Sequence, residues 1–348
     1  MALNHRALRK APLALAYWLG IAGSARRNDG RARILMFHGT PRRHAGAFER
    51  GLRYLKRNFD IVPLGSIAAD AGSRDVRFRR QIALTFDDGL RNNVEIAYPL
   101  LKELGIPGTF FVCPGLIERA GWLWNHEARQ RLLRLRPEAV RELARESGTG
   151  TQVEDIVEWM KSLDRAARER AEERVRDATH NFAATAEERH DFDLAGWEEL
   201  ERLDPSVVTI GSHTMTHPIL PSLSDEGIEI EVRESRRALE ARLDRAVDLF
   251  AYPNGDSNPA THDCVRRHYR AAVTVEEGWV DGDCDLHLLP RINAHWSGLK
   301  LALALHRDYF LVTPTKASGS QVASSGNAVI SAMHSTIMKK NGSEASAT

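Results

Sequence analysis

Cysteine is scarce in this chain, which holds only Cys113, Cys264 and Cys284 among 348 residues. An odd count without paired spacing predicts neither a disulfide framework nor a metal cluster built from cysteine thiolates. We therefore expect the three thiols to behave as small, buried apolar side chains.

An excess of one charge sign is also absent, because 48 lysines and arginines face 47 aspartates and glutamates, giving a formal net charge of +1. Nucleic-acid-binding proteins gain much of their affinity from basic side chains that displace counterions from phosphates. The balanced charge therefore argues against a nucleic-acid partner. The length fits one or two domains, and nothing in the pattern determines an oligomeric state.

Apolar runs long enough to span a bilayer are missing as well. The stretch 11–25 is mostly small and apolar and follows a basic segment, but a transmembrane helix needs about 20 apolar residues. It fits either a weak signal peptide cleaved near Gly23-Ser24-Ala25 or an amphipathic surface helix. The second alternative would let the N-terminal segment 1–32 contact a membrane peripherally, so the location stays open between cytoplasm and cell envelope.

The chain does contain a regular alternation of short apolar runs and amphipathic stretches. Runs of strand length lie at 34–37, 82–86, 109–112, 207–210, 247–252, 271–275 and 286–292, with an extended piece at 61–64. Helical spacing of apolar residues recurs at 48–58, 93–104, 224–243, 259–268 and 298–310. This pattern is typical of an α/β protein with a parallel sheet of seven or eight strands and helices outside.

One apolar run, Ile82–Phe86, ends at two adjacent carboxylates and a glycine, Asp87-Asp88-Gly89. Two ionised carboxylates at the end of a buried strand repel each other and lose hydration, and a bound cation would relieve both costs. An isolated Asp-Asp-Gly is otherwise a polar turn that uses the conformational freedom of glycine.

A second apolar run, Val207–Ile210, leads into His213 and His217. Residues four apart share one face of a helix, but Pro218 disfavours a helical conformation at His217, so a turn that holds both rings is an equal alternative. Such a pair alone arises by chance more often than not. Together with a carboxylate from another strand end, it supplies three ligands and one position for water, as in catalytic zinc sites.

These motifs resemble a known family. Thr85-Phe86-Asp87-Asp88-Gly89 and Ser212-His213-Thr214-Met215-Thr216-His217 are similar to the first two signature motifs of the polysaccharide deacetylase family, the NodB homology domain of carbohydrate esterase family 4. Phe250-Ala251-Tyr252-Pro253-Asn254-Gly255 resembles the third, in the form found in exopolysaccharide deacetylases. The resemblance covers about 33–312 and implies a distorted (β/α) barrel of about seven strands.

The resemblance implies that Asp88, His213 and His217 bind a divalent metal and that Asp87 is the general base. A carboxylate and two neutral imidazoles suit zinc, although nickel, cobalt or iron would also bind. The ion would lower the pKa of a bound water towards about 7 and polarise an acetamide carbonyl. A backbone N–H near Tyr252 is expected to help to hold the oxyanion.

The general acid and the groups around the substrate are less clearly marked. The family usually supplies the acid as a histidine after a leucine near the end of the domain, and neither Leu286-His287 nor Asn293-Ala294-His295 matches that pattern. We favour His38, at the end of the first predicted strand, as the acid, the alternative for each histidine being a surface position.

Leu289-Pro290-Arg291-Ile292 resembles the late motif of exopolysaccharide deacetylases, and we expect Arg291 to pair with Asp87 and lower its pKa. The usual arginine of the third motif is absent, and Asn254 lies in its neighbourhood. Tyr252, Asn254 and Trp279 are the expected substrate-binding residues. Trp279 would wall the acetyl pocket or, equally, belong to the core.

Residues 122–192 interrupt the strand–helix alternation with a stretch rich in Arg, Glu, Ala and Leu. We expect two or three helices there, one of them a solvated helix over 164–177. The insertion is either a helical decoration or a lid beside the substrate groove, with Trp122, Trp124 and Trp159 available to stack on sugar rings. The segment 313–348, rich in Ser, Ala and Gly, is predicted to be a disordered tail.

These observations predict a metal-dependent hydrolase that removes N-acetyl groups from a polysaccharide or glycan, in the modification of exopolysaccharide or cell-envelope glycans. Two alternatives stay open. One is a carbohydrate-binding protein on the same fold that has lost turnover, and the other is an enzyme for O-acetyl esters or non-sugar amides.

Overall fold

The computed structural model describes residues 30–71, 78, 80–294, 301 and 305. The predicted N-terminal signal peptide or surface helix and the predicted disordered tail lie outside the described residues. The predicted closing helix over 298–310 also lies outside them, except for Leu301 and Leu305. Among the described residues, no helix is long and apolar enough to cross a membrane.

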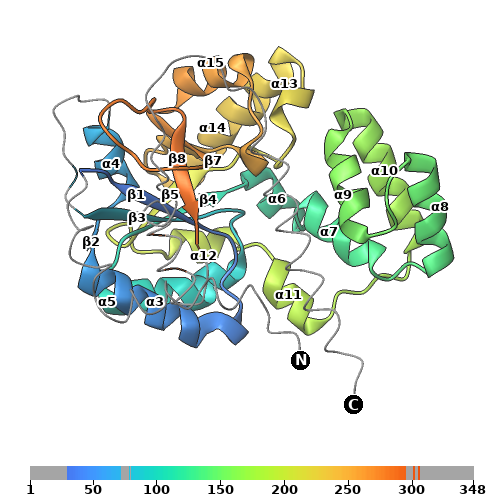
Figure 1. Cartoon of the computed structure of the whole chain (residues 1–348), viewed down its shortest axis with the longest axis horizontal. Helices are drawn as coiled ribbons and strands as arrows, with labels where there is room; N and C mark the ends of the chain where they lie inside the picture. The colour runs from blue at the N-terminus through green and yellow to red at the C-terminus, as the bar shows by residue number, and fades with distance from the viewer. Residues whose placement is uncertain (1–29, 72–77, 79, 295–300, 302–304, 306–348) are drawn as a thin grey trace, which may run out of the picture.

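Seven parallel strands form a closed barrel, which confirms the predicted fold class (Figure 1). The strands are β1 (Arg33–Phe37), β3 (Gln81–Phe86), β4 (Gly108–Val112), β5 (Val208–Ser212), β6 (Leu249–Ala251), β7 (Ala271–Glu277) and β8 (Leu289–Asn293). The ring closes because β1 pairs with β3 on one side and with β8 on the other. The two-residue strand β2 (Asp60–Ile61) adds to the first half of β3.

Successive strand residues alternate between the barrel interior and the surrounding helices, as in any pleated strand. In β1, Ile34 packs with Ala83 and other interior residues, whereas Leu35 packs with residues of the outer helices. In β8, the same alternation places Arg291 on the interior side and Ile292 on the helical side. A charged side chain thus occupies the barrel interior and requires a partner there.

The helices around the barrel include those predicted at 48–58, 93–104, 224–243 and 259–268, together with three short helices that were not predicted. They are α3 (Ala45–Asn58), α4 (Leu64–Asp70), α5 (Tyr98–Leu104), α6 (Pro114–Arg119), α12 (Trp197–Glu201), α13 (Asp225–Glu229), α14 (Ser235–Leu243) and α15 (Pro259–His268). The predicted helix 93–104 begins with a π-helical turn, Asn93–Ala97. The predicted extended piece 61–64 is only partly correct, because Leu64 already begins α4, which packs against the barrel interior.

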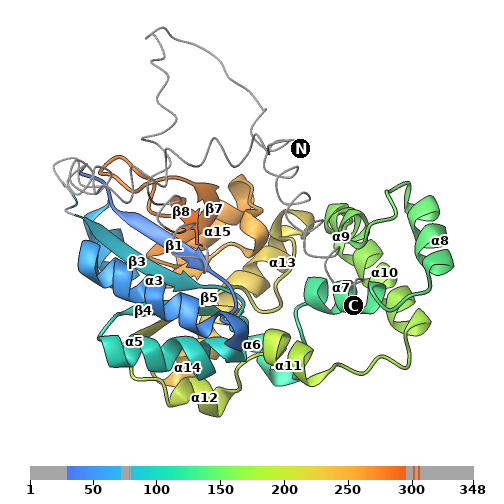
Figure 2. The same cartoon turned by 60° about the horizontal axis from the view of Figure 1, so that its bottom comes forward.

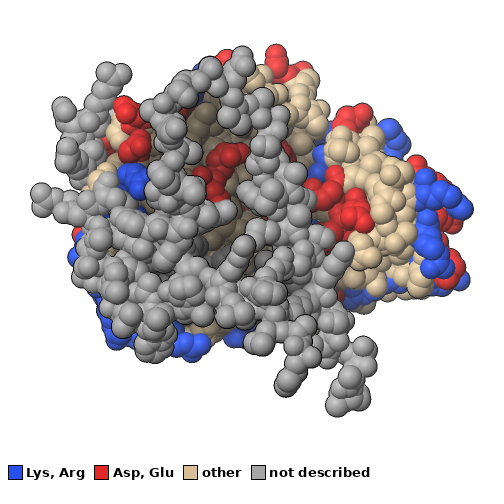
Figure 3. Space-filling view, in the orientation of Figure 1, with Lys and Arg blue, Asp and Glu red and all other residues tan. Residues whose placement is uncertain are grey.

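The insertion forms a bundle of four helices with its own core beside the barrel, and a fifth helix that lies apart from them, next to the barrel (Figure 1, Figure 2). It contains five helices, not the two or three predicted: α7 (Trp124–Leu132), α8 (Pro137–Ser147), α9 (Val153–Ser162), α10 (Arg165–Ala178) and α11 (Ala186–Phe192). Local signals divide it, since Gly148 ends α8 in the left-handed conformation and Asp164 caps α10. Acidic side chains lie where the bundle approaches the barrel, and basic ones gather at its outer edge (Figure 3).

The three tryptophans of this region have structural partners. Trp124 is buried in the core of the bundle, where the guanidinium carbon of Arg168 lies 4.8 Å from its ring centre. Trp159 packs against the same core. Trp122 donates a hydrogen bond of 2.8 Å to Asp193. The burial of Arg168 and its ion pair with Glu172, at 3.1 Å, also correct the prediction of a fully solvated α10.

Candidate active site

The two adjacent carboxylates lie in a sharp turn at the carboxyl end of β3. The backbone N–H of Asp87 donates to the carbonyl of Phe37, which extends the pairing of β3 with β1 by one residue. Asp88 then adopts a positive φ of 74°, and Gly89 one of 69°. A Cβ atom at Gly89 would lie 3.0 Å from Val112, so that both the backbone conformation and the space favour glycine there.

The two histidines lie in a loop that follows β5, which settles the choice between helix and turn in favour of a turn. Thr214 and His217 have positive φ values of 68° and 55°. Such conformations cost about 1–3 kcal/mol each and tend to gather at functional sites. The N–H of His217 donates to the Thr214 hydroxyl at 3.0 Å, and this bond closes the turn.

Glu231 stabilises this loop from the side. Its carboxylate accepts hydrogen bonds from the Thr216 N–H at 2.9 Å and the Thr216 hydroxyl at 2.6 Å, and its carbonyl accepts one from Met215. Glu231 lies in the π-helical turn Ile230–Glu234 and is buried. Its role could not be predicted from the sequence, because no local pattern links Glu231 to the histidine motif.

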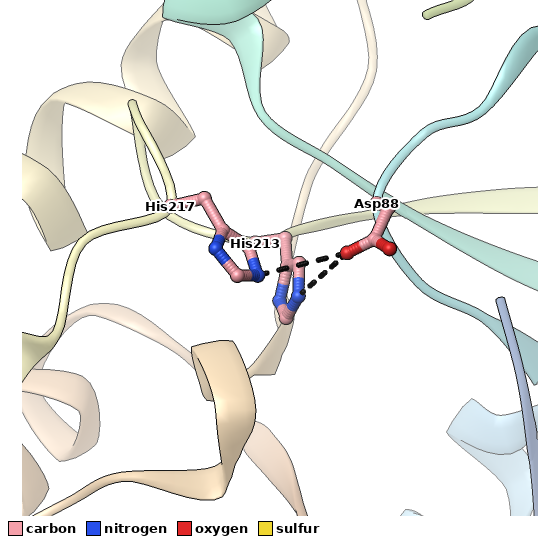
Figure 4. Close-up of side chains that lie close together, drawn as sticks. All are labelled: Asp88, His213 and His217. Atoms are coloured by element: carbon pink, nitrogen blue, oxygen red, sulfur yellow. Dashed lines mark ion pairs between the residues drawn. The ribbon is translucent and has the colours of Figure 1, made fainter. Parts of the chain in front are cut away.

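Asp88, His213 and His217 converge at the carboxyl-terminal rim of the barrel (Figure 4). The Nε2 atoms of His213 and His217 lie 3.7 and 3.6 Å from the same oxygen of Asp88, Oδ1. One ligand atom from each residue lies within 4.8 Å of the others, and all three side chains are buried. The predicted ligand set therefore comes together in space.

The chemistry of these three groups fits a divalent cation. The Nδ1 atom of His213 lies 2.8 Å from the carbonyl of Ala251, so Nδ1 carries the proton and Nε2 presents a lone pair. Burial, with a smaller contribution from His213, lowers the pKa of His217 to about 3 and keeps that ring neutral. Burial raises the pKa of Asp88, but other groups, His38 first among them, bring it below its ordinary value, so the carboxylate is ionised.

Arg291 pairs with Asp87 as expected. Its guanidinium donates hydrogen bonds of 2.7 Å to both carboxylate oxygens, a third of 3.1 Å to Thr85 and a fourth of 2.7 Å to the carbonyl of Thr274. Burial alone would raise the pKa of Asp87, but the charge and hydrogen bonds of Arg291 outweigh it and hold the pKa at about 2. Asp87 is thus an ionised carboxylate directly beside Asp88.

His38 follows β1 at the same rim, and its side chain is exposed. It lines a pocket of about 290 Å³ that also contains Leu90 and Asn293 from the barrel. Of the other two histidines considered, His287 lies 2.8 Å from the carbonyl of Tyr269 and beside Arg266, away from this pocket. His295 lies outside the described residues.

The structure does not support all of the predicted substrate contacts. Tyr252 is fully buried, and its N–H donates to the carbonyl of Val273 within the sheet, so neither its ring nor this N–H is accessible to a substrate. Asn254 follows β6 at the correct rim, with a φ of 53°. Its Nδ2 has no hydrogen-bond partner among the described residues, but it is buried, so this nitrogen is not exposed to a substrate.

Trp279 does not reach the site. The guanidinium carbon of Arg31 lies 4.9 Å from its ring centre, and its neighbour Val280 pairs with Ala32, just before β1 begins. Because β1 and β3 run parallel, with Phe37 opposite Phe86, this position is at the end of the barrel opposite to Asp87. Trp279 packs against the outer core instead, which was the alternative.

A histidine that the sequence analysis overlooked lies next to the cluster. His126, from α7 of the insertion, has its Nε2 atom 3.9 Å from Oδ2 of Asp88. Burial lowers its pKa to about 4, so the ring is neutral at physiological pH. In the sequence, this stretch stands out only through the nearby Trp122 and Trp124, which suggested stacking on sugar rings and gave no role to a histidine.

A second group of ligand-type side chains, Glu229, Cys264 and His268, lies elsewhere on the barrel. The Glu229 carboxylate already contacts Arg267 at 3.0 Å and Arg233 at 3.3 Å, besides His268 at 2.8 Å. Two arginines neutralise the charge that a cation would need, so this cluster is an ion-pair network. The prediction that the cysteines behave as buried apolar side chains is only partly correct for Cys264, because it is buried but donates a hydrogen bond to Glu229.

The sequence model of the polysaccharide deacetylase family matches residues 76–272. This span holds Asp87, Asp88, His213 and His217, and it exceeds half of the chain. The chain therefore belongs to the polysaccharide deacetylase family, whose members are hydrolases that act on acetylated polysaccharides. No curated protein sequence matches the chain significantly.

Solved structures with the same fold include deacetylase PplD of Streptococcus pyogenes, in complex with acetate. It is 18% identical over 79% of this chain and 98% of its own, with a TM-score of 0.54. IcaB of Ammonifex degensii is 16% identical over 80% of this chain and 98% of its own, with a TM-score of 0.52. BC0361, a polysaccharide deacetylase from Bacillus cereus, is 17% identical over 79% of this chain and 69% of its own, with a TM-score of 0.50. These likenesses establish the fold of the barrel.

Proposed function

We propose that this protein is a metal-dependent N-deacetylase that acts on an N-acetylated polysaccharide or glycan, as part of exopolysaccharide or cell-envelope modification. The observation that carries the proposal is the convergence of Asp88, His213 and His217 beside Asp87, which is ionised and oriented by Arg291. Zinc is the proposed ion, because one carboxylate and two neutral imidazoles leave a tetrahedral position open for water.

A bound zinc ion would lower the pKa of its water and polarise the acetyl carbonyl. The residues of the chain supply the proton transfers. Asp87 is the proposed general base, because it is ionised and adjacent to Asp88. Arg291 fixes both of its oxygens, so the carboxylate accepts a proton without first changing its orientation.

His38 is the proposed general acid. It is exposed in the pocket beside the cluster, where it can reach the departing nitrogen of a substrate. An amine must be protonated as it leaves, whereas an alcohol leaves an ester more easily. Loss of His38 should therefore impair cleavage of an N-acetyl group more than cleavage of an O-acetyl group.

Acetate release tests the proposal. We would incubate the protein with N-acetylglucosamine oligomers, peptidoglycan and acetylated exopolysaccharide, each with a chelator and after zinc or cobalt is restored. We expect release from at least one N-acetylated substrate, abolished by the chelator and recovered with metal. Glycan binding without acetate release under any metal would identify a carbohydrate-binding protein, and release only from O-acetylated material would identify an esterase.

A further inference from the structure

The helical insertion places one imidazole at the proposed metal site. His126 lies 3.9 Å from Oδ2 of Asp88, whereas His213 and His217 approach the other oxygen, Oδ1. His126 is not one of the three residues whose ligand atoms all lie within 4.8 Å of one another. His126 is therefore a neighbour of the proposed metal ligands and is not itself one of them.

His126 lacks the internal partner that a structural histidine would have. Its side chain is only 16 % exposed, and its buried Nδ1 atom has no hydrogen-bond partner among the described residues. Leaving a buried polar atom unpaired is energetically unfavourable. The ring packs against Phe192 of α11, with 5.0 Å between the ring centres. The Nδ1 atom itself is covered, but Nε2, at 3.9 Å from Asp88, is too far away for a direct hydrogen bond and has no other partner among the described residues. Nε2 is therefore the nitrogen that a ligand in the adjoining space can reach.

That space is the pocket of about 290 Å³ described above. His38, Leu90 and Asn293 line it from the barrel, and His126, Asp191 and Phe192 line it from the insertion. Both parts of the chain thus form the walls of one cavity beside Asp88. Imidazole groups, a carboxylate and aromatic or aliphatic surface together suit a sugar ring, which has polar edges and apolar faces.

The part of the insertion that lines the pocket is attached to the barrel. Arg43 forms an ion pair of 2.7 Å with Asp191, and the side-chain amide of Asn92 donates a hydrogen bond of 3.0 Å to the carbonyl of His190. Just after α11, Leu194 pairs with Leu90. Phe192 and the ring of His126 that it supports are therefore held in place on the rim, as a specificity-determining wall requires.

We propose that His126 binds the substrate: its imidazole forms a hydrogen bond with a polar group of the N-acetylated sugar in the pocket, and Phe192 supports the imidazole from behind. The insertion is then part of the active site, and it determines which glycans fit. This inference rests on the proposed function, because the sugar is the substrate proposed there.

Binding and metal affinity are the measurements that test this inference. Titration calorimetry would compare the binding of an N-acetylglucosamine tetramer to zinc-loaded Asp87→Asn protein with and without His126→Ala. Loss of one hydrogen bond in a buried site predicts about 10-fold weaker binding. His126→Gln keeps a hydrogen-bonding group and should lose less. His180→Ala, which changes an exposed histidine of the same insertion, should bind as the parent does.

Three further readouts separate substrate binding from other roles. In the otherwise unmodified enzyme, His126→Ala should raise KM for the tetramer about 10-fold with little change in kcat, since a contact made equally in ground and transition states affects KM alone. Hydrolysis of a small aryl acetate, too small to fill the pocket, should be affected less than hydrolysis of the tetramer. Zinc affinity, measured separately, should also stay within about twofold of the parent.

The outcomes distinguish this inference from the proposed function. If the parent binds the tetramer and both His126 variants bind it with the same affinity, the inference is overturned and the proposed function stays intact. A zinc affinity that falls with His126→Ala would also overturn it, because His126 would then serve the ion. Absence of tetramer binding and of acetate release in the unmodified protein would overturn both. If His126→Ala fails to fold, the His126→Gln variant decides.

Discussion

Arg291 donates two hydrogen bonds of 2.7 Å to the carboxylate of Asp87, a residue 204 positions earlier in the chain. The pair forms because β8 and β3 flank β1, which closes the barrel. Both side chains are buried, so each would be an uncompensated charge without the other. Closure of the barrel therefore orients the proposed base.

Replacement of that base should abolish most of the activity. General-base catalysis contributes about 100- to 10,000-fold, so we expect Asp87→Asn to lower kcat for acetate release by a factor in this range. Zinc binding should persist, because the proposed ligand is Asp88. Full activity of Asp87→Asn would exclude this assignment.

Removal of the arginine should chiefly affect stability. Arg291→Met leaves Asp87 buried without its partner, and breaking a buried ion pair on one side costs about 3–5 kcal/mol. Urea unfolding of the chelated protein measures this loss. In an Asp87→Asn background the same change should cost less, because no buried carboxylate remains unpaired. Equal costs in the two backgrounds would show that the pair is not coupled.

The pH dependence of stability should reveal the same pair. The pKa of Asp87 is about 2 in the folded protein and 3.8 in its ordinary state. The unfolded chain therefore binds this proton at higher pH, and the stabilisation is complete above about pH 4–5 and is lost as the pH falls towards about 2. The difference in pKa corresponds to about 2 kcal/mol.

Urea unfolding of the metal-free protein between about pH 6 and pH 2 measures this contribution. His217, whose pKa is also lowered, adds its own loss of stability in acid, between its ordinary value of 6.5 and about 3. Both the unmodified protein and Asp87→Asn contain His217, so the difference between their pH profiles isolates the contribution of Asp87. Identical pH profiles for the two proteins would contradict the lowered pKa of Asp87.

The loop that holds the two histidines should depend on Glu231. Glu231→Gln removes the charge that accepts two hydrogen bonds from Thr216, so we expect zinc affinity to fall about 10-fold, in the range seen for residues that support metal ligands. Glu234→Gln, on the same π-helical turn but half-exposed, is the matched control and should leave zinc affinity unchanged. Equal effects of the two changes would show that Glu231 has no special role.

The central part of the site could be predicted because it lies at strand ends. Asp88 and His213 each lie within three residues of the end of an apolar run, and the carboxyl ends of parallel strands meet at one rim of a barrel. Arg291 could be placed with Asp87 only through the resemblance to a family motif. The strands themselves were predictable because buried parallel strands are continuous apolar runs.

Other features depend on packing that no local pattern reveals. His126 belongs to an ordinary amphipathic helix, and only the docking of the insertion onto the barrel brings it to Asp88. The sequence left Trp279 open between the acetyl pocket and the core, because it does not show that the chain after β7 turns back so that Val280 pairs with Ala32. Tyr252 was expected to face the substrate, but sheet pairing uses its N–H and the core buries its ring.

Zinc titration of the chelated protein tests the central claim, that Asp88, His213 and His217 together hold one ion. We expect one zinc ion per chain, bound about 100-fold or more weakly in His217→Ala, since a direct ligand should matter at least as much as the residues that support it. Asp87→Asn, and Cys264→Ser in the second cluster, should bind as the unmodified protein does. Undiminished affinity in His217→Ala, or binding lost in Cys264→Ser, would contradict the account.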